Sequence, residues 1–137
     1  MKSNVEVRKT ININAELAWD TIRRSDGLET WFPAITSCRL DGDKRFCTLA
    51  GGGDVVETIL EIDNRSRIFR YSVDEHPLPV GPVQTSIQII ERGSNCEVIW
   101  RANFEGSDEG VKMVAPMLEG LYAQGIDALA SHHQLVN

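Results

Sequence analysis

The chain has no long apolar run, few cysteines and a deficit of positive charge. No segment approaches the about 20 consecutive apolar residues of a membrane-spanning helix, so we expect no membrane span. The formal net charge is −6, from 14 Lys and Arg against 20 Asp and Glu. A nucleic-acid-binding surface needs excess positive charge to neutralise phosphates, so nucleic acid is not an expected partner.

Cysteine is scarce and unpatterned. Cys38, Cys47 and Cys96 are an odd number, are widely spaced and form no Cys-x-x-Cys pair. We therefore expect reduced thiols, typical of a reducing compartment. The residues after Met1 lead directly into a predicted strand without the apolar core of a signal peptide. Together these features predict a cytoplasmic protein.

Repeats, linkers and low-complexity tracts are also absent, and the length is that of one domain, residues 1–137. Alternating polar and apolar residues between turns rich in Gly, Asp and Asn predict strands joined as antiparallel hairpins. The predicted strands cover residues 5–11, 35–40, 45–49, 54–62, 68–73, 83–90 and 96–104. Lys9 interrupts the apolar face of the first of them.

Helical patterns occupy the remaining chain. Asn14 is a suitable N-cap for a short helix, and a second short helix is predicted over residues 28–32. A long helix follows Ser107 or Asp108, either of which can cap it. Pro116 is expected to kink this helix or to mark the start of its main segment.

A long antiparallel sheet with one terminal helix must lay that helix across one face to cover its apolar side chains. The sequence therefore predicts an α+β fold, in which a curved seven-stranded antiparallel sheet wraps around the C-terminal helix. Two short helices follow the first strand. A curved sheet gripping a helix tends to leave a cavity, where we expect the function to lie.

Seven short segments, in this order along almost the whole chain, resemble a known superfamily. They are residues 15–19, 31–33, 55–57, 70–73, 77–79, 98–100 and 120–122. The resemblance is to the START-like (SRPBCC) helix-grip superfamily, which has the birch-pollen-allergen fold, and especially to small bacterial polyketide cyclase/dehydrase-like proteins. It implies the fold but no single activity, because members carry lipids, sense hormones or catalyse cyclisations.

Two loops are similar to mobile loops of the plant abscisic-acid receptors, which share this fold. Residues 51–53, three glycines, fall where the receptors have their gate loop, and residues 75–78 resemble their latch. Thr36 stands where a lysine anchors the hormone carboxylate, and Pro77 replaces the latch arginine. An acidic ligand of that type therefore loses its counter-ion and is not expected here.

The resemblance places Glu57 in the cavity, whereas strand alternation alone leaves open whether it faces solvent. If Glu57 is inside, burial should raise its pKa unless Arg45 or a ligand donor pairs with it. The predicted ligand-contacting residues come from the inner strand faces, one loop and one stripe of the last helix. They are Glu57, Tyr71, Val73, His76, Thr85, Ile87, Trp100, Met117, Leu121 and Gly125.

Few titratable groups are candidates for chemistry. Glu57, Tyr71 and His76 could move protons, although an exposed loop histidine is the simpler interpretation of His76. His132 and His133, near the end of the last helix, do not have the spacing of zinc ligands with His76. We therefore expect neither a metal nor a cofactor.

Three functions remain open from the sequence. The first is a binding protein that holds a small, largely apolar molecule such as a polyketide, lipid or aromatic metabolite. The second is a polyketide cyclase or dehydratase that uses Glu57, Tyr71 or His76 for proton transfer. The third is a protein-interaction role of the sheet or loops. The sequence does not distinguish a monomer from a homodimer.

Overall fold

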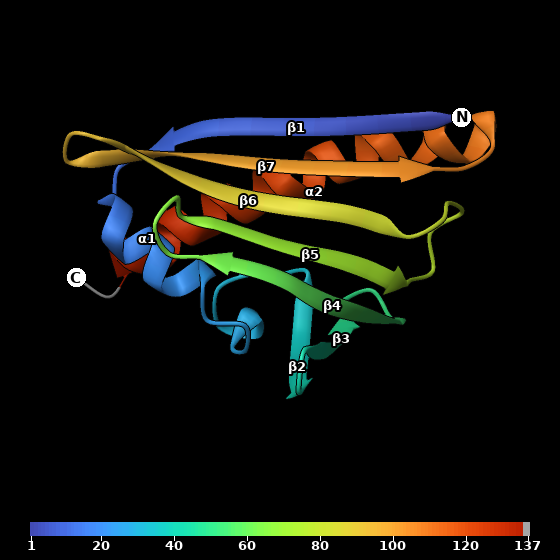
Figure 1. Cartoon of the computed structure of the whole chain (residues 1–137), viewed down its shortest axis with the longest axis horizontal. Helices are drawn as coiled ribbons and strands as arrows, with labels where there is room; N and C mark the ends of the chain where they lie inside the picture. Colours follow the sequence, from blue (N-terminus) through green and yellow to red (C-terminus); the bar gives the residue numbers. More distant parts are fainter. Residues whose placement is uncertain (136–137) are drawn as a thin grey trace.

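The computed structural model describes residues 1–135, and a seven-stranded sheet and a long C-terminal helix dominate it (Figure 1). The elements are β1 (Lys2–Ile11), α1 (Ala15–Ile22), η1 (Leu28–Thr30), β2 (Ile35–Asp41), β3 (Lys44–Leu49), β4 (Asp54–Asp63), β5 (Ile68–Glu75), β6 (Val83–Arg92), β7 (Asn95–Glu105) and α2 (Asp108–Leu135). The predicted α+β helix-grip class is confirmed.

The sheet is antiparallel throughout and has the strand order β1-β7-β6-β5-β4-β3-β2. Strands β2 to β7 form a meander of hairpins, and β1 joins the far side of β7. The register places Val7 opposite Trp100 and Thr85 opposite Ala102. Because side chains alternate along a strand, the inner face of β7 carries Val98, Trp100, Ala102 and Phe104, all buried.

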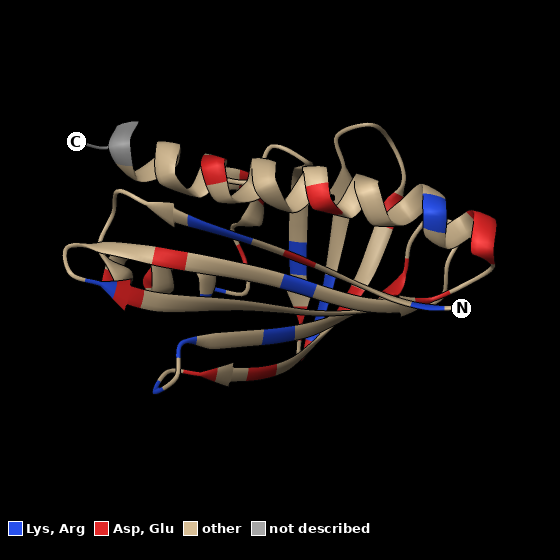
Figure 2. Ribbon diagram, turned by 90° about the horizontal axis from the view of Figure 1, so that it is seen from above, with Lys and Arg blue, Asp and Glu red and all other residues tan. Residues whose placement is uncertain are grey.

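Helix α2 forms the second layer and runs along one face of the sheet, closest to β1 (Figure 2). Its buried side includes Val114, Leu118 and Ile126. Lys9, which interrupts the inner face of β1, places its Nζ 2.7 Å from Oδ1 of Asp127 on α2. No helix within residues 1–135 is both long and apolar enough to cross a membrane.

Side-chain caps begin both α-helices. The Asn14 side chain accepts a hydrogen bond of 2.8 Å from the Leu17 amide, as the sequence predicts. At α2, Ser107 Oγ accepts from the Gly110 amide at 3.0 Å, so Ser107 is the capping residue. The helix continues through Pro116, and the alternative that Pro116 starts its main segment is therefore wrong.

The second short helix is smaller than predicted. It is the single turn η1, and Trp31 and Phe32 follow it as buried side chains rather than as helical residues. Gly27, with φ of 73°, begins the turn in the left-handed region, and Pro33 disfavours helix at the residue before it. The space between Gly27 and Pro33 accommodates little more than one turn.

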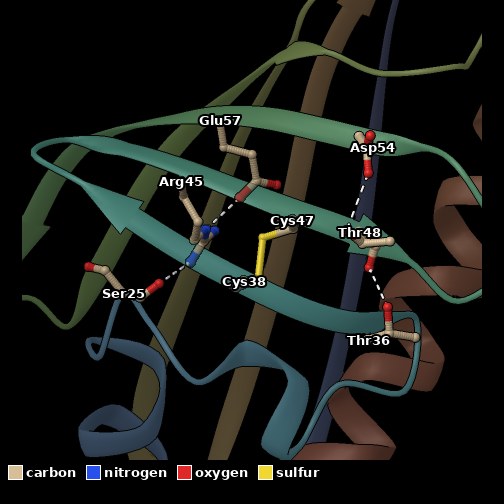
Figure 3. Close-up of a disulfide and its surroundings, with 8 residues drawn as sticks. All are labelled: Ser25, Thr36, Cys38, Arg45, Cys47, Thr48, Asp54 and Glu57. Carbon is tan, nitrogen blue, oxygen red and sulfur yellow. Dashed lines mark hydrogen bonds and ion pairs between the residues drawn. A yellow bond between two sulfur atoms is a disulfide. The ribbon is translucent and has the colours of Figure 1, made fainter.

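The cysteine prediction is wrong for two of the three thiols. Cys38 and Cys47 form a disulfide between β2 and β3, at directly opposed positions with a Cα–Cα distance of 4.2 Å (Figure 3). The hairpin turn brings together two residues that the linear spacing makes look unrelated. Cys96 is free and buried, and burial raises the pKa of its thiol to about 11. The disulfide removes one argument for a cytoplasmic location, which stays a prediction.

Candidate functional site

A cavity of about 380 Å³ lies between the inner face of the sheet and α2. Its wall combines Ile22, segment 28–35, the inner faces of β3 to β7, the loops at 49–52 and 76–78, and one side of α2. Most of the lining side chains are aliphatic or aromatic. The curvature of the sheet and the position of α2 thus produce the internal space expected from the element order.

Most of the predicted ligand-contacting residues line this cavity, although contact with a ligand stays a prediction. Those on the wall are Glu57, Tyr71, Val73, His76, Ile87, Trp100, Met117 and Leu121. Thr85 and Gly125 are buried but lie outside the wall. Thr85 is on β6, directly opposite Tyr71 on β5.

Gly125 allows two aromatic rings to approach α2 closely. A Cβ atom built at this position would lie 2.6 Å from Trp100 Cζ3 and 3.1 Å from Phe32 Cε1. Contacts below 3.0 Å do not occur between real atoms of this kind, so a larger residue would displace Trp100. Gly125 therefore shapes the cavity indirectly, by setting the positions of Trp100 and Phe32.

Four aromatic residues form one continuous wall. Trp100 stacks on Tyr122 with 4.7 Å between ring centroids, and Trp31 stacks on Phe32 at 5.4 Å. Phe32 and Trp100 join the two pairs at 5.5 Å. Rings in such contact present flat, apolar surfaces to a bound molecule. The wall is therefore suited to planar or hydrocarbon groups.

A buried ion pair forms the polar part of the wall. Arg45 Nε donates to Glu57 Oε1 at 2.6 Å, and Arg45 Nη1 donates to the Ser25 carbonyl at 3.1 Å (Figure 3). The side chains of Arg45 and Glu57 are 3% and 9% exposed. The Arg45 guanidinium also lies over the Tyr71 ring, 5.1 Å from its centroid. Glu57 thus faces inward, as the resemblance implies, and has the Arg45 partner named as one alternative.

Burial raises the pKa of Glu57, and this effect exceeds the opposing effects of the Arg45 charge and hydrogen bond. The nearby Asp74 carboxylate adds to the increase. Glu57 therefore holds its proton more readily than an exposed glutamate does, which is a property of carboxyl groups that act as acids or bases in enzymes.

Tyr71 and Tyr122 are both phenols on the cavity wall, and burial raises the pKa of each. The Trp100 indole lies close enough to Tyr71 to oppose this increase, and Thr85 does the same for Tyr122. Neither the Trp100–Tyr71 nor the Thr85–Tyr122 contact is a hydrogen bond. Trp100 Nε1 and Thr85 Oγ1 are the buried side-chain atoms in residues 1–135 that have no partner. A buried group left without a partner costs about 1–3 kcal/mol.

His76 has both ring nitrogens occupied by its own loop. Its Nε2 lies 2.8 Å from the Gly81 carbonyl, and its Nδ1 accepts from the Leu78 amide at 3.1 Å. This arrangement requires the neutral tautomer with the proton on Nε2. His76 therefore holds the loop in shape, and its candidacy as an acid or base is weakened.

The two loops predicted as the entrance lie against each other at the cavity. Residues 50–52 and 76–78 belong to the wall, and a Cβ at Gly53 would lie 3.5 Å from the Pro77 ring. Gly52 and Gly53 have φ of 93° and 99°, in the region that favours glycine. The position suits an entrance, whereas mobility of the loops stays a prediction.

Metal ligands and the position compared with the hormone-anchoring lysine were also considered. No group of three or more His, Cys, Asp and Glu side chains in residues 1–135 could hold a metal ion. Thr36, at the position compared with the hormone-anchoring lysine, is exposed, and its hydroxyl donates to the Thr48 carbonyl at 3.3 Å (Figure 3).

Some wall residues were not proposed as ligand contacts from the sequence. Arg45 was considered only as a partner of Glu57, and Tyr122 only as part of the helical stripe. Alternation along β3 places Arg45 and Cys47 on the inner face, but Phe46, the residue that looks apolar, is on the outer side beneath Arg39. The opposed positions of Arg45 and Glu57 in the hairpin pairing were the one available indication.

A curved antiparallel sheet that grips a C-terminal helix around a cavity defines a helix-grip protein. The family described as "Polyketide cyclase / dehydrase and lipid transport" matches residues 2–134, and the chain belongs to this family. No curated protein matches the chain. An uncharacterised protein from Bacillus thuringiensis is similar at 25% identity, over 98% of this chain and 100% of that one, with a TM-score of 0.86.

Two enzymes have the same fold at lower identity. Norcoclaurine synthase from Thalictrum flavum, in complex with a transition-state analogue, is 18% identical over 100% of this chain and 98% of that one, with a TM-score of 0.80. The Zhui aromatase/cyclase from a Streptomyces species is 16% identical over 100% and 97%, with a TM-score of 0.82. At these identities the likeness establishes the fold alone.

Proposed function

We propose that this protein binds a small, largely apolar molecule, of the polyketide, lipid or aromatic-metabolite kind, in the cavity between the sheet and α2. The observation that carries the proposal is the cavity of about 380 Å³, with its aromatic wall and single buried ion pair. Ligand sites are typically concave, apolar and supplied with a few polar groups that orient the ligand. The family supports the same class of function.

Native mass spectrometry of protein purified from its own host tests this proposal. We expect an additional mass that dissociates on unfolding. Leu121→Trp should abolish it, because Leu121 lines the cavity and tryptophan would fill part of the space. Leu60→Trp is the matched control, since Leu60 is 54% exposed and outside the wall. Retention of the mass by Leu121→Trp would place the ligand elsewhere.

A cyclase or dehydratase is the second candidate, favoured by one observation. Glu57, with its raised pKa, shares the cavity wall with the Tyr71 phenol, so an acid or base and a hydrogen-bond donor are both available to one ligand. Glu57→Gln separates the two functions. A binding protein should retain its ligand within about tenfold, because glutamine keeps the shape and most of the hydrogen-bonding capacity.

General acid–base catalysis contributes about 10²–10⁴-fold to a rate, so an enzyme should lose that factor in Glu57→Gln. We expect retained binding and no turnover by the native protein. Conversion of a polyketide-like substrate by the native protein, together with a folded but inactive Glu57→Gln variant, would instead establish the enzyme.

A further inference from the structure

The carboxyl group of Glu57 has one oxygen in a hydrogen bond and one that is open to the cavity. Oε1 accepts from Arg45 Nε at 2.6 Å, and the other oxygen points away from the guanidinium (Figure 3). That oxygen, Oε2, accepts no hydrogen bond within residues 1–135, yet it is not one of the side-chain atoms sealed off without a partner. The space that Glu57 lines is the cavity. A molecule bound there would therefore cover Oε2.

Arg45, the partner of Glu57, does not depend on the Glu57 charge alone. Its Nη1 donates to the Ser25 carbonyl at 3.1 Å. Its guanidinium also lies 5.5 Å from the centroid of the Phe69 ring and 5.1 Å from that of the Tyr71 ring, and aromatic faces attract a cation. A protonated Glu57 can still accept from Arg45 Nε through its carbonyl oxygen. Arg45 thus keeps all of these contacts when Glu57 loses its charge.

Glu57 has no comparable second partner for its own charge. Water that reaches Oε2 stabilises the ionised carboxylate, and an apolar molecule in the cavity would exclude that water. Loss of water from a carboxyl group favours the protonated form, because burying a charge costs far more than burying a neutral group. Burial already raises the pKa of Glu57 in the free protein, and a ligand would act in the same direction.

Other charged or titratable groups surround Glu57 from the neighbouring elements. They are Lys44 and Arg45 on β3, Tyr71 and Asp74 on β5, Tyr122 on α2 and His76 in the loop. Lys44 and Asp74 pair at 3.7 Å, and the Asp74 carboxylate favours a neutral Glu57. Burial raises the pKa of both phenols above the ordinary value of 10.0, so they stay neutral. A second proton on His76 would break its hydrogen bond from the Leu78 amide. Glu57 can take up a proton without such a loss.

We infer that the protein binds an uncharged apolar ligand together with a proton, which Glu57 holds on the oxygen that the ligand covers. The inference rests on the proposed binding function and adds a means of release. Binding is tightest at mildly acidic pH, where Glu57 already carries the proton. It weakens as the pH rises and Glu57 ionises, and the affinity levels off at its lower value once Glu57 is ionised in the complex as well.

N-phenyl-1-naphthylamine is a suitable probe, because it is an uncharged aromatic molecule that fluoresces strongly in apolar surroundings. We expect its dissociation constant for the native protein to increase at least about tenfold from about pH 5 to about pH 9, which is the effect of one pKa unit between the free and bound states. In Glu57→Gln the dissociation constant should change less than about twofold over this range, because glutamine cannot ionise. The fluorescence of the bound probe also reports that the variant is folded.

Two further variants separate Glu57 from other titrating groups. Glu61→Gln removes a half-exposed carboxylate from the same strand, and the pH dependence of binding should match that of the native protein. His76→Gln removes the imidazole from the cavity wall. The pH dependence should persist in His76→Gln, whatever the affinity of this variant.

Proton uptake gives a readout that a purely structural role of Glu57 would not change. It is measured by isothermal titration calorimetry in two buffers of different ionisation enthalpy, at the pH where the dissociation constant changes most steeply. We expect the native protein to take up a fraction of a proton for each probe molecule bound. Glu57→Gln should take up none.

A dissociation constant of the native protein that does not change with pH would overturn the inference and leave the binding function standing. Proton uptake that persists in Glu57→Gln would do the same, and so would binding that strengthens as the pH rises, since Arg45 would then hold Glu57 ionised beneath the ligand. If the probe does not bind, retention of the host ligand is compared by native mass spectrometry at the two pH values, and equal retention overturns the inference. Absence of both probe binding and a host ligand would overturn the binding function as well.

Discussion

The Arg45–Glu57 pair determines how the cavity wall responds to pH. Burial outweighs Arg45, so the pKa of Glu57 is higher in the folded chain than its ordinary value of 4.5. The folded protein therefore binds this proton more tightly than the unfolded chain does. Glu57 contributes most to stability below its unfolded-state pKa, and this contribution is lost as the pH rises through its folded-state pKa.

Glu57→Gln should remove this pH dependence, because glutamine resembles the protonated side chain and can still accept from Arg45. We expect the free energy of unfolding of Glu57→Gln to match that of the native protein near pH 4.5, the ordinary pKa of Glu57. At neutral pH the variant should be as stable as the native protein or more stable. Urea unfolding of both proteins across this pH range provides the measurement.

Glu61→Gln is the matched control for this experiment. Glu61 is on the same strand but pairs with Arg70 at the surface, where both side chains are about half exposed. Its removal should change the free energy of unfolding by less than about 1 kcal/mol at any pH. A large loss of stability in Glu57→Gln at neutral pH would mean instead that the charge of the carboxylate is needed to hold Arg45.

Individual residues are also where the sequence was least informative. Alternation on β4 makes Val56, Leu60 and Ile62 the more apolar face, but Leu60 and Ile62 are 54% and 40% exposed. The pairing of β4 with β5 shifts register between Ile59 and Glu61, which interrupts the simple alternation. Such an irregularity depends on the neighbouring strand and cannot be deduced from the β4 sequence alone.

The elements were more predictable than their side chains, since hairpin turns and helical stripes are local patterns. All seven strands and the N-cap Asn14 were correctly predicted. The errors concern η1, which is shorter than predicted, and the alternative that α2 has its main start at Pro116, because the helix already begins at Asp108. For η1 the cause is local, since Gly27 and Pro33 leave room for little more than one turn.

Two glycines of α2 should respond oppositely to substitution by alanine. Gly125→Ala should lower the free energy of unfolding by about 1–3 kcal/mol, because the new methyl group overlaps Trp100 and Phe32. Gly120→Ala should raise it by up to about 1 kcal/mol, because Gly120 is exposed with no atom within 4 Å and alanine is the better helix former. Urea unfolding measures both variants.

The comparison between these variants isolates packing from helix propensity, since both substitutions gain the same propensity. Equal stabilisation of the two would show that Trp100 and Phe32 move away without penalty. The aromatic wall would then be adaptable, and Gly125 would not determine the shape of the cavity.

The disulfide should stabilise the β2–β3 hairpin. Its cysteines are separated by 9 residues, and closing a loop of this size is worth about 2–3 kcal/mol in the chain-entropy treatment. Dithiothreitol should therefore lower the free energy of unfolding of the native protein. It should not affect Cys38→Ser/Cys47→Ser, which serves as the control. An identical response of both proteins would contradict a structural disulfide, as would three free thiols in unreduced, denatured protein.

The cavity itself is a property of the whole molecule. Its wall joins residues from 22 to 122, and its shape depends on how far the sheet curves around α2. The element order predicts that such a space exists, and the inner strand faces supply most of the correct wall residues. Arg45 was expected only as a possible partner of Glu57 and not as part of the wall. The approach of Trp100 and Phe32 to Gly125 depends on distances between segments that are far apart in sequence.

Entry of a ligand should depend on the two loops that meet at Gly53 and Pro77. The glycine loop has few restraints, because Gly51, Gly52 and Gly53 are exposed. Two backbone hydrogen bonds close it: the Leu49 amide donates to the Gly53 carbonyl, and the Gly52 amide donates to the Leu49 carbonyl. We expect the amides of residues 51–53 to exchange with solvent faster than those of β6 and β7.

Addition of the ligand that co-purifies from the host should slow exchange in residues 51–53 by about tenfold, because a filled cavity supports the loop from inside. The loop at 76–78 should change less, since His76 already ties it to Gly81 and Leu78. His76→Ala tests the difference between the two loops. Without the His76 hydrogen bonds, the amides of residues 76–78 should exchange as fast as those of residues 51–53. If both loops of the native protein exchange as slowly as the centre of the sheet, the ligand must enter by another route.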